Sequence, residues 1–202
     1  METKLDTKIL KIAYSHGYFP MPDPKTNEIC WFNPDPRAVI PLNGFHCSKS
    51  LKRTLRKVPF EITIDKAFAE VMKGCADRKE TWITEEFHRA YNELHQQGYA
   101  HSLEVWLEGQ LVGGVYGVSL GGAFFAESKF HKVTDASKVA LYYLVKTLNK
   151  LNFKILEVQF MIPHLKSLGA IEIPAEKYFE ELKIALKMPT TFKGDNNGNV
   201  ER

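Results

Sequence analysis

The sequence predicts an α+β protein in which a mixed sheet is flanked by helices. Three runs of alternating apolar residues, 102–106, 111–118 and 123–130, follow one another across short breaks that contain glycine, which is typical of an antiparallel meander. An amphipathic segment over about 135–150 predicts a long helix, and the apolar run 154–160 predicts a further short strand. These observations define the centre of the expected fold.

The first part of the chain, residues 1–58, is expected to form a small N-terminal domain. Apolar spacing predicts a short helix over residues 5–15. The three prolines within 20–24 predict a segment without regular structure. Residues 29–41 alternate prolines with aromatic and β-branched residues, which indicates a bent, extended segment.

The helix predicted over residues 48–58 carries one wholly basic face. Its cations recur at i, i+3, i+4, i+7 and i+8 with no acid among them, whereas a solvated face usually mixes signs. Two interpretations stay open, a solvated surface and a phosphate-binding helix. The cations are Lys49, Lys52, Arg53, Arg56 and Lys57.

The remaining elements follow from periodicity and capping. Residues 60–64 read as a strand, Asp65 opens a helix with a buried apolar stripe, and 85–97 form another helix. A last helix is predicted over 174–187. The polar, Gly- and Asn-rich segment 188–202 is expected to be a disordered tail.

Composition excludes several classes of protein. The chain has 202 residues with 44% hydrophobic and 25% charged residues, which is ordinary for a globular domain. No apolar run approaches the roughly 18–20 residues of a membrane helix, so no membrane partner is expected, and the N-terminus does not read as a signal peptide. Three cysteines without CxxC spacing favour a reducing cytoplasm and argue against a disulfide framework or a metal site.

Two acids lie in otherwise apolar strands. In the run 154–160, Glu157 and Gln159 share one strand face, and Glu127 lies among apolar neighbours in 124–130. A buried acid or amide costs free energy unless it is paired or used. These residues therefore predict a polar reaction centre with hydrophobic walls.

The order meander, long helix, strand and short helix is similar to that of N-acetyltransferases of the GNAT type. In that architecture the sheet splays and an acyl donor enters the gap. Coenzyme A would need a glycine-rich loop at the start of the central helix, and the junction 130–138 contains no glycine. A coenzyme A-dependent amine acetyltransferase therefore remains only an alternative, and no cofactor is expected. A non-catalytic RNA-binding module is a second alternative, which leaves the acids unexplained.

The chain resembles the leucyl/phenylalanyl-tRNA–protein transferase family, a bacterial family of N-terminal protein tagging. The matching segments lie in one collinear order between residues 13 and 180. They are 13–14, 17–20, 31, 33–39, 74–76, 81–84, 100–106, 111–118, 127–128, 136–138 and 167–170.

This resemblance implies a transfer of leucine or phenylalanine from aminoacyl-tRNA to the N-terminal amine of proteins that begin with Arg or Lys, which marks them for degradation. Residues 59–187 would then be the catalytic domain of a cytoplasmic protein, expected to be a monomer. The basic helix would bind tRNA phosphates. The sequence leaves the preference among leucine, phenylalanine and methionine open.

The apolar residues Val115, Phe124 and Ile155 are expected to build the pocket for the donor side chain. In the family a Trp that follows the Gly-x-Phe-Pro segment is thought to stack on the terminal adenosine. Here that position is Met21, and Trp82 or Tyr14 is expected to compensate.

The reaction itself needs positioning more than covalent catalysis, because the ester is already activated and an α-amine titrates near pH 8. We expect Glu157 with Gln159 to orient and deprotonate the amine, while Glu127 holds the acceptor or the donor's amino group. The family usually has Asp where Glu157 stands, so the acid here is one methylene longer.

Overall fold

The structure is a computed structural model that describes residues 5–23, 25–26, 28–194, 198 and 200. A mixed sheet of seven strands forms its centre, and helices flank the sheet, so the predicted α+β, GNAT-type architecture is confirmed. All neighbouring strands are antiparallel except β7 and β8, which are parallel. The strands lie in the order β4 (Glu61–Ile64), β5 (Ala100–Leu107), β6 (Gln110–Leu120), β7 (Ala123–His131), β8 (Ile155–Glu157), β3 (Arg37–Val39) and β9 (Ile171–Ile173).

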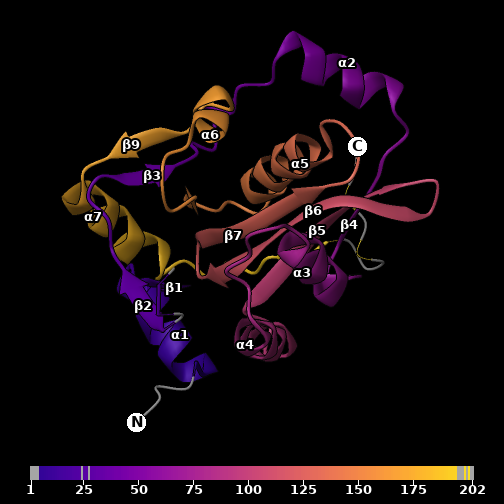
Figure 1. Ribbon diagram of the computed structural model, residues 1–202. Helices are drawn as coiled ribbons and strands as arrows, with labels where there is room; N and C mark the ends of the chain where they lie inside the picture. Colours follow the sequence, from indigo (N-terminus) through magenta and orange to yellow (C-terminus); the bar gives the residue numbers. More distant parts are fainter. Residues whose placement is uncertain (1–4, 24, 27, 195–197, 199, 201–202) are drawn as a thin grey trace.

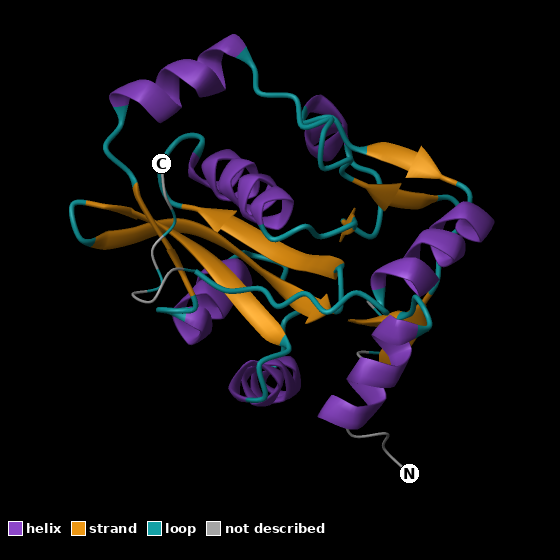
Figure 2. Cartoon of the chain, turned by 180° about the vertical axis from the view of Figure 1, so that it is seen from behind, coloured by secondary structure: helices purple, strands orange, loops and turns teal. Residues whose placement is uncertain are grey.

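Helices cover both faces of the sheet (Figures 1 and 2). On one face α5 (Ala136–Lys150) buries Val139 and Leu144 in the first apolar core, and on the other α3 (Phe68–Ala76) and α4 (Glu85–Gln96) contribute Phe68 and Phe87 to the second. Burial of an amphipathic face on each side of a central sheet is what the helical periodicity predicts. The other helices are α1 (Thr7–Ser15), α2 (Lys49–Lys57), α6 (Pro163–Ser167) and α7 (Ala175–Ala185).

The parallel neighbours β7 and β8 pair only over Ala123–Phe125 and Ile155–Glu157. β7 then continues to His131, whereas β8 ends. The predicted strand over 154–160 is therefore too long. Gln159 has φ of 64°, a left-handed conformation that an extended strand does not accommodate.

The proline-containing segment near residue 20 does form regular structure, so the prediction that it would not is wrong. β1 (Phe19–Pro22) pairs antiparallel with β2 (Ile29–Phe32) in a separate two-stranded sheet. Proline is tolerated in an edge strand because the missing N–H need not face a partner. Both strands of this sheet are edges.

The ends of the chain join the central body more closely than expected. β3, which lies within the first 58 residues, is part of the seven-stranded sheet, and the division of the chain at residue 58 stays a prediction. In the expected tail, Phe192 is 1% exposed and packs against Phe124, and the Val200 N–H donates to the Ile62 carbonyl. These contacts join described residues of the expected tail to the sheet, and the disordered tail over 188–202 stays a prediction; 195–197, 199 and 201–202 lie outside the described residues.

Candidate active site

A pocket of about 220 Å³ lies where β7 and β8 diverge. Its walls come from elements far apart in the sequence: the β1 strand, the loop before α4, β6, β7, α5, and the segment from β8 into α6. The lining residues are Met21, Arg78, Trp82, Val115, Ala126, Glu127, Ser128, Lys129, Leu141, Val158, Gln159, Phe160, Ile162 and Leu165. Of the three predicted polar residues, Glu127 and Gln159 line this pocket.

Glu127 reaches the pocket from an irregularity in β7. Tyr116 pairs with Ser128 and the next residue, Gly117, pairs with Ala126, which leaves Glu127 as an extra residue without a partner in β6. A Cβ atom on Gly117 would clash with the Phe125 carbonyl oxygen, so the close strand approach beside this bulge requires glycine. Bulges commonly re-aim one side chain at a functional site.

The Glu127 side chain is buried against two tyrosines. The Tyr14 hydroxyl donates to its Oε1 at 2.6 Å, the Tyr91 hydroxyl lies 3.2 Å from its Oε2, and the two hydroxyls also hydrogen-bond to each other. The three hydrogen bonds among Tyr14, Tyr91 and Glu127 require three hydrogen atoms, and the two phenol groups supply only two. The third comes from the Glu127 carboxyl group, which is therefore protonated. Burial, with the nearby charge of Glu157, raises the pKa of Glu127 to about 8.

The Gln159 side chain completes the polar end of the pocket. The backbone of Gln159 is fixed at two points: its carbonyl oxygen accepts from the Ala38 N–H at 3.3 Å, and its N–H bonds to the Glu157 carboxyl. Its amide lies near Glu127 and counters part of the rise in the pKa of that acid, but the buried Nε2 atom has no hydrogen bond of normal geometry to any described residue. A buried donor beside a cavity with no protein partner is a candidate ligand contact.

Glu157 does not line the pocket. It lies 1% exposed behind Gln159, and its Oε1 forms a 2.9 Å ion pair with Arg37 Nη1. The Tyr178 hydroxyl donates to its Oε2 at 3.2 Å. Burial raises the pKa of Glu157, and the Arg37 charge and these hydrogen bonds oppose that rise.

The apolar predictions divide into two groups. Val115, Trp82 and Met21 line the pocket. Phe124 and Ile155 do not, because they lie where β7 and β8 are still paired, and they are buried in the two apolar cores. Tyr14 also lies outside the lining and acts on the site through its bond to Glu127.

The predicted basic helix is α2, with Ser48 as its N-cap, and its five predicted cations are exposed. None of these cations forms an ion pair with a described residue. Its Thr54 hydroxyl donates to Asp135 at the start of α5 at 3.1 Å. The helix therefore presents a positive surface that is anchored next to the pocket's α5 wall.

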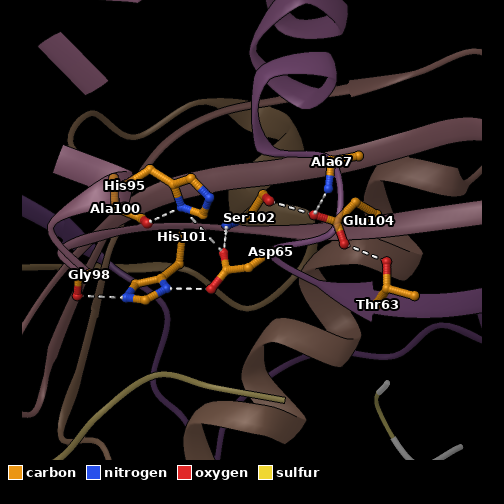
Figure 3. Close-up of polar contacts among 9 residues, drawn as sticks. All are labelled: Thr63, Asp65, Ala67, His95, Gly98, Ala100, His101, Ser102 and Glu104. Carbon is orange, nitrogen blue, oxygen red and sulfur yellow. Dashed lines mark hydrogen bonds and ion pairs between the residues drawn. The ribbon is translucent and has the colours of Figure 1, made fainter. Parts of the chain in front are cut away.

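A second cluster of buried polar groups joins β4, β5 and α4 (Figure 3). Glu104 is fully buried and accepts from the Thr63 and Ser102 hydroxyls and, at 3.4 Å, from the Ala67 N–H. The ring of His101 contacts Asp65 at 2.7 Å and the Gly98 carbonyl at 3.1 Å. None of these residues lines the pocket, so this cluster joins elements of the fold.

The sequence-based reasoning missed Arg37, Tyr91, Arg78 and Lys129. Tyr91 was visible as a member of the buried stripe of α4, where a phenol needs a hydrogen-bond partner. Arg37 pairs with a residue 120 positions away, which no local pattern indicates.

Two further properties concern metals and membranes. Within the described ranges, no group of three or more His, Cys, Asp or Glu side chains is arranged to hold a metal ion. No helix of the same part of the chain is both long and apolar enough to cross a bilayer.

Comparison with known proteins identifies the family of the chain. The family model described as leucyl/phenylalanyl-tRNA protein transferase matches residues 39–183, and the model of the N-terminal domain of that transferase matches residues 3–35. The chain belongs to this family. Its members' enzyme class, aminoacyltransferase, is therefore the class of this protein, as the sequence predicted.

Relatives named leucyl/phenylalanyl-tRNA–protein transferase are similar along nearly the whole chain. The protein from Ruegeria pomeroyi is 50% identical over 93% of this chain and 90% of its own length. The one from Gloeobacter violaceus is 48% identical over 96% of this chain and 100% of its own. Among solved structures, a ribosomal-protein-alanine N-acetyltransferase from Brucella melitensis biovar Abortus 2308 gives a TM-score of 0.40 at 16% identity, covering 60% of this chain and 89% of that one.

Proposed function

We propose that this transferase moves leucine or phenylalanine from aminoacyl-tRNA to the N-terminal amine of proteins that begin with Arg or Lys. The observation that carries the proposal is the pocket between β7 and β8, with apolar walls and with Glu127 and the unpartnered Gln159 amide at one end. Its volume of about 220 Å³ is below the roughly 300–1,000 Å³ of pockets that take whole small molecules, and suits one apolar side chain.

The reaction exchanges an ester for an amide. The acceptor nitrogen attacks the aminoacyl carbonyl carbon, the bond from that carbon to the ribose oxygen breaks, and a proton passes from nitrogen to the leaving oxygen. An oxyanion develops on the carbonyl oxygen in between. A preorganised N–H donor at that oxygen stabilises the transition state more than the ground state.

We assign these tasks differently from the sequence-based expectation. Gln159 Nε2 donates to the developing oxyanion, because it is a buried donor at the pocket without a partner. Glu127 exchanges the proton with the acceptor amine, because a pKa of about 8 is close to that of an α-amine and proton transfer between matched groups is efficient.

Glu157 is then a positioning residue instead of the base. Its carboxyl is held by Arg37 and Tyr178 and holds the backbone N–H of Gln159 in turn. The left-handed backbone at Gln159 costs roughly 1–2 kcal/mol in an L-residue, and such conformations persist where surrounding contacts enforce them. Glu157 supplies one of those contacts.

Acceptor choice, location and oligomeric state complete the proposal. Recognition of N-terminal Arg or Lys, marking of acceptors for degradation, a cytoplasmic location and a monomeric state are inferred from the family resemblance. Binding of tRNA by the basic face of α2 is supported by its five exposed cations.

The activity is tested with labelled Leu-tRNA and a peptide that begins with Arg. We expect transfer to this peptide, none to the same peptide with an acetylated N-terminus, and less to a peptide that begins with Glu. Acetyl transfer from acetyl-coenzyme A to the Arg peptide would favour the acetyltransferase alternative. Binding of Leu-tRNA without transfer to any peptide would favour the RNA-binding module.

The role of Gln159 is tested by Gln159→Met, which keeps the side-chain length and removes the N–H donor. We expect kcat to fall roughly 100- to 1,000-fold, as for loss of one oxyanion donor, with KM for Leu-tRNA unchanged. Steady-state transfer rates measure both. A loss confined to KM would instead make Gln159 a donor-binding residue.

A further inference from the structure

Two cations lie in the wall of the pocket beside its polar end. Lys129 is two residues beyond Glu127 on β7, and Arg78 follows α3; both line the cavity. Arg78 is fixed by its Nη2 donating to the Ser128 hydroxyl and its Nε donating to the Cys75 carbonyl, each at 2.7 Å. No carboxylate among the described residues forms an ion pair with either cation, although Asp77 and Glu80 are close to Arg78 in sequence.

Lys129 is held in an unfavourable place for a cation. It is half-buried, and burial together with the charge of Arg78 lowers the pKa of its ammonium group. Two neighbouring cations without an acid repel each other, and the half-buried Lys129 also loses hydration. An anion that enters the pocket mouth would relieve both costs.

The positive surface continues from Lys129 towards the start of α5. The half-buried His164 of α6 has a lowered pKa because of burial and the charges of Lys129, Lys138 and His131, so all three groups are close to its ring. Lys138 pairs with Asp135 at 2.8 Å. We call the set Arg78, Lys129, His131, Lys138 and His164 the basic track.

The basic track leads to the tRNA-binding helix predicted from the sequence. Asp135, which holds Lys138, also accepts from Thr54 of α2, and Figure 1 shows α2 lying alongside α5. Cations therefore extend from the exposed face of α2, past the beginning of α5, into the pocket. The route ends beside Glu127 and Gln159, where the aminoacyl group has to be placed.

We propose that the basic track binds the phosphodiester groups of the single-stranded 3′ end of the donor RNA and guides the aminoacyl side chain into the pocket. This inference rests on the proposed function. The backbone phosphates of RNA carry one charge per nucleotide and are bound by Lys and Arg without regard to sequence. The track matches that need, because Arg78, Lys129 and Lys138 carry positive charge and, among the described residues, only Lys138 forms an ion pair with an acid, Asp135.

The test compares two donors, Leu-tRNA and leucyl-adenosine, which carries the same ester but no phosphate. With Lys129→Met and with Arg78→Met we expect the KM for Leu-tRNA to rise about 10-fold and the slope of log KM against log salt to fall by about one. The loss with leucyl-adenosine should be at least several-fold smaller. Lys129→Arg should restore binding of Leu-tRNA, and Lys166→Met, an exposed lysine on α6 outside the track, should change neither donor.

Several results would overturn the inference. Equal losses with both donors would mean that Lys129 and Arg78 support the pocket rather than the RNA. If Lys129→Met and Arg78→Met slow transfer only to acceptor peptides with an acidic second residue, the track binds the acceptor peptide and not the donor RNA. A failure of the proposed function is distinguishable, because the unmodified protein would then transfer leucine from neither donor.

Discussion

Glu127 and Glu104 are both buried acids in this sheet, but their surroundings differ. Glu104, in the cluster of Figure 3, accepts from two hydroxyls and a backbone N–H and borders no pocket. Glu127 borders the cavity, next to an amide without a partner and to cations without acids. Burial raises the pKa of both. A shifted acid therefore does not by itself indicate a reaction site; incompletely satisfied neighbours around a cavity do.

The largest expected loss of stability follows from removing Arg37, which pairs with Glu157 behind the pocket. The Glu104 cluster contains no arginine in this role. Arg37→Met removes the cation that partners the buried Glu157 carboxyl, and should lower the free energy of unfolding by about 3–5 kcal/mol. Urea denaturation measures this. The double variant Arg37→Met, Glu157→Gln should recover most of the loss. Equal losses in the single and double variants would show that Arg37 acts through packing on Tyr178 and Phe19 instead.

The pH dependence of the free energy of unfolding should reveal the contribution of Glu127. Its folded pKa of about 8 exceeds the ordinary value of 4.5, so between these pH values the folded state binds more protons than the unfolded state. Stability should therefore fall as pH rises through this window, by roughly 3–5 kcal/mol from this group. Glu127→Gln cannot ionise, so relative to the unmodified protein it should gain stability from pH 5 to pH 8. Parallel denaturation curves would contradict this.

The smallest effect is expected at Glu104. Glu104→Gln replaces one acceptor oxygen by a donor that faces other donors, which should cost about 1–3 kcal/mol of unfolding free energy. Transfer from Leu-tRNA should keep its kcat and KM at a temperature where the variant is folded. A fall in kcat comparable to that of Gln159→Met would remove the distinction between the two regions.

Most of the fold follows from sequence periodicity. The meander, α5 and the basic helix α2 each read correctly because their patterns are local. Glu127 and Gln159 line the pocket, and their roles in a reaction stay a prediction. Arg37 and Glu157 are 120 positions apart in the sequence, and Tyr14 and Glu127 are 113 positions apart. A single sequence does not reveal that such distant residues form hydrogen bonds. The packing of Phe192 against Phe124 of β7 is likewise a long-range contact that the local composition of residues 188–202 does not indicate.

The bulge in β7 has a consequence for how such a site arises. All the other paired residues of β6 and β7 keep one partner each on either side of residue 127. Deletion of the single codon for Glu127 would therefore leave β6 and β7 paired in one continuous register, with every remaining residue opposite its present partner. One inserted codon in a plain hairpin is, by the same reasoning, enough to present a carboxyl group to the cleft.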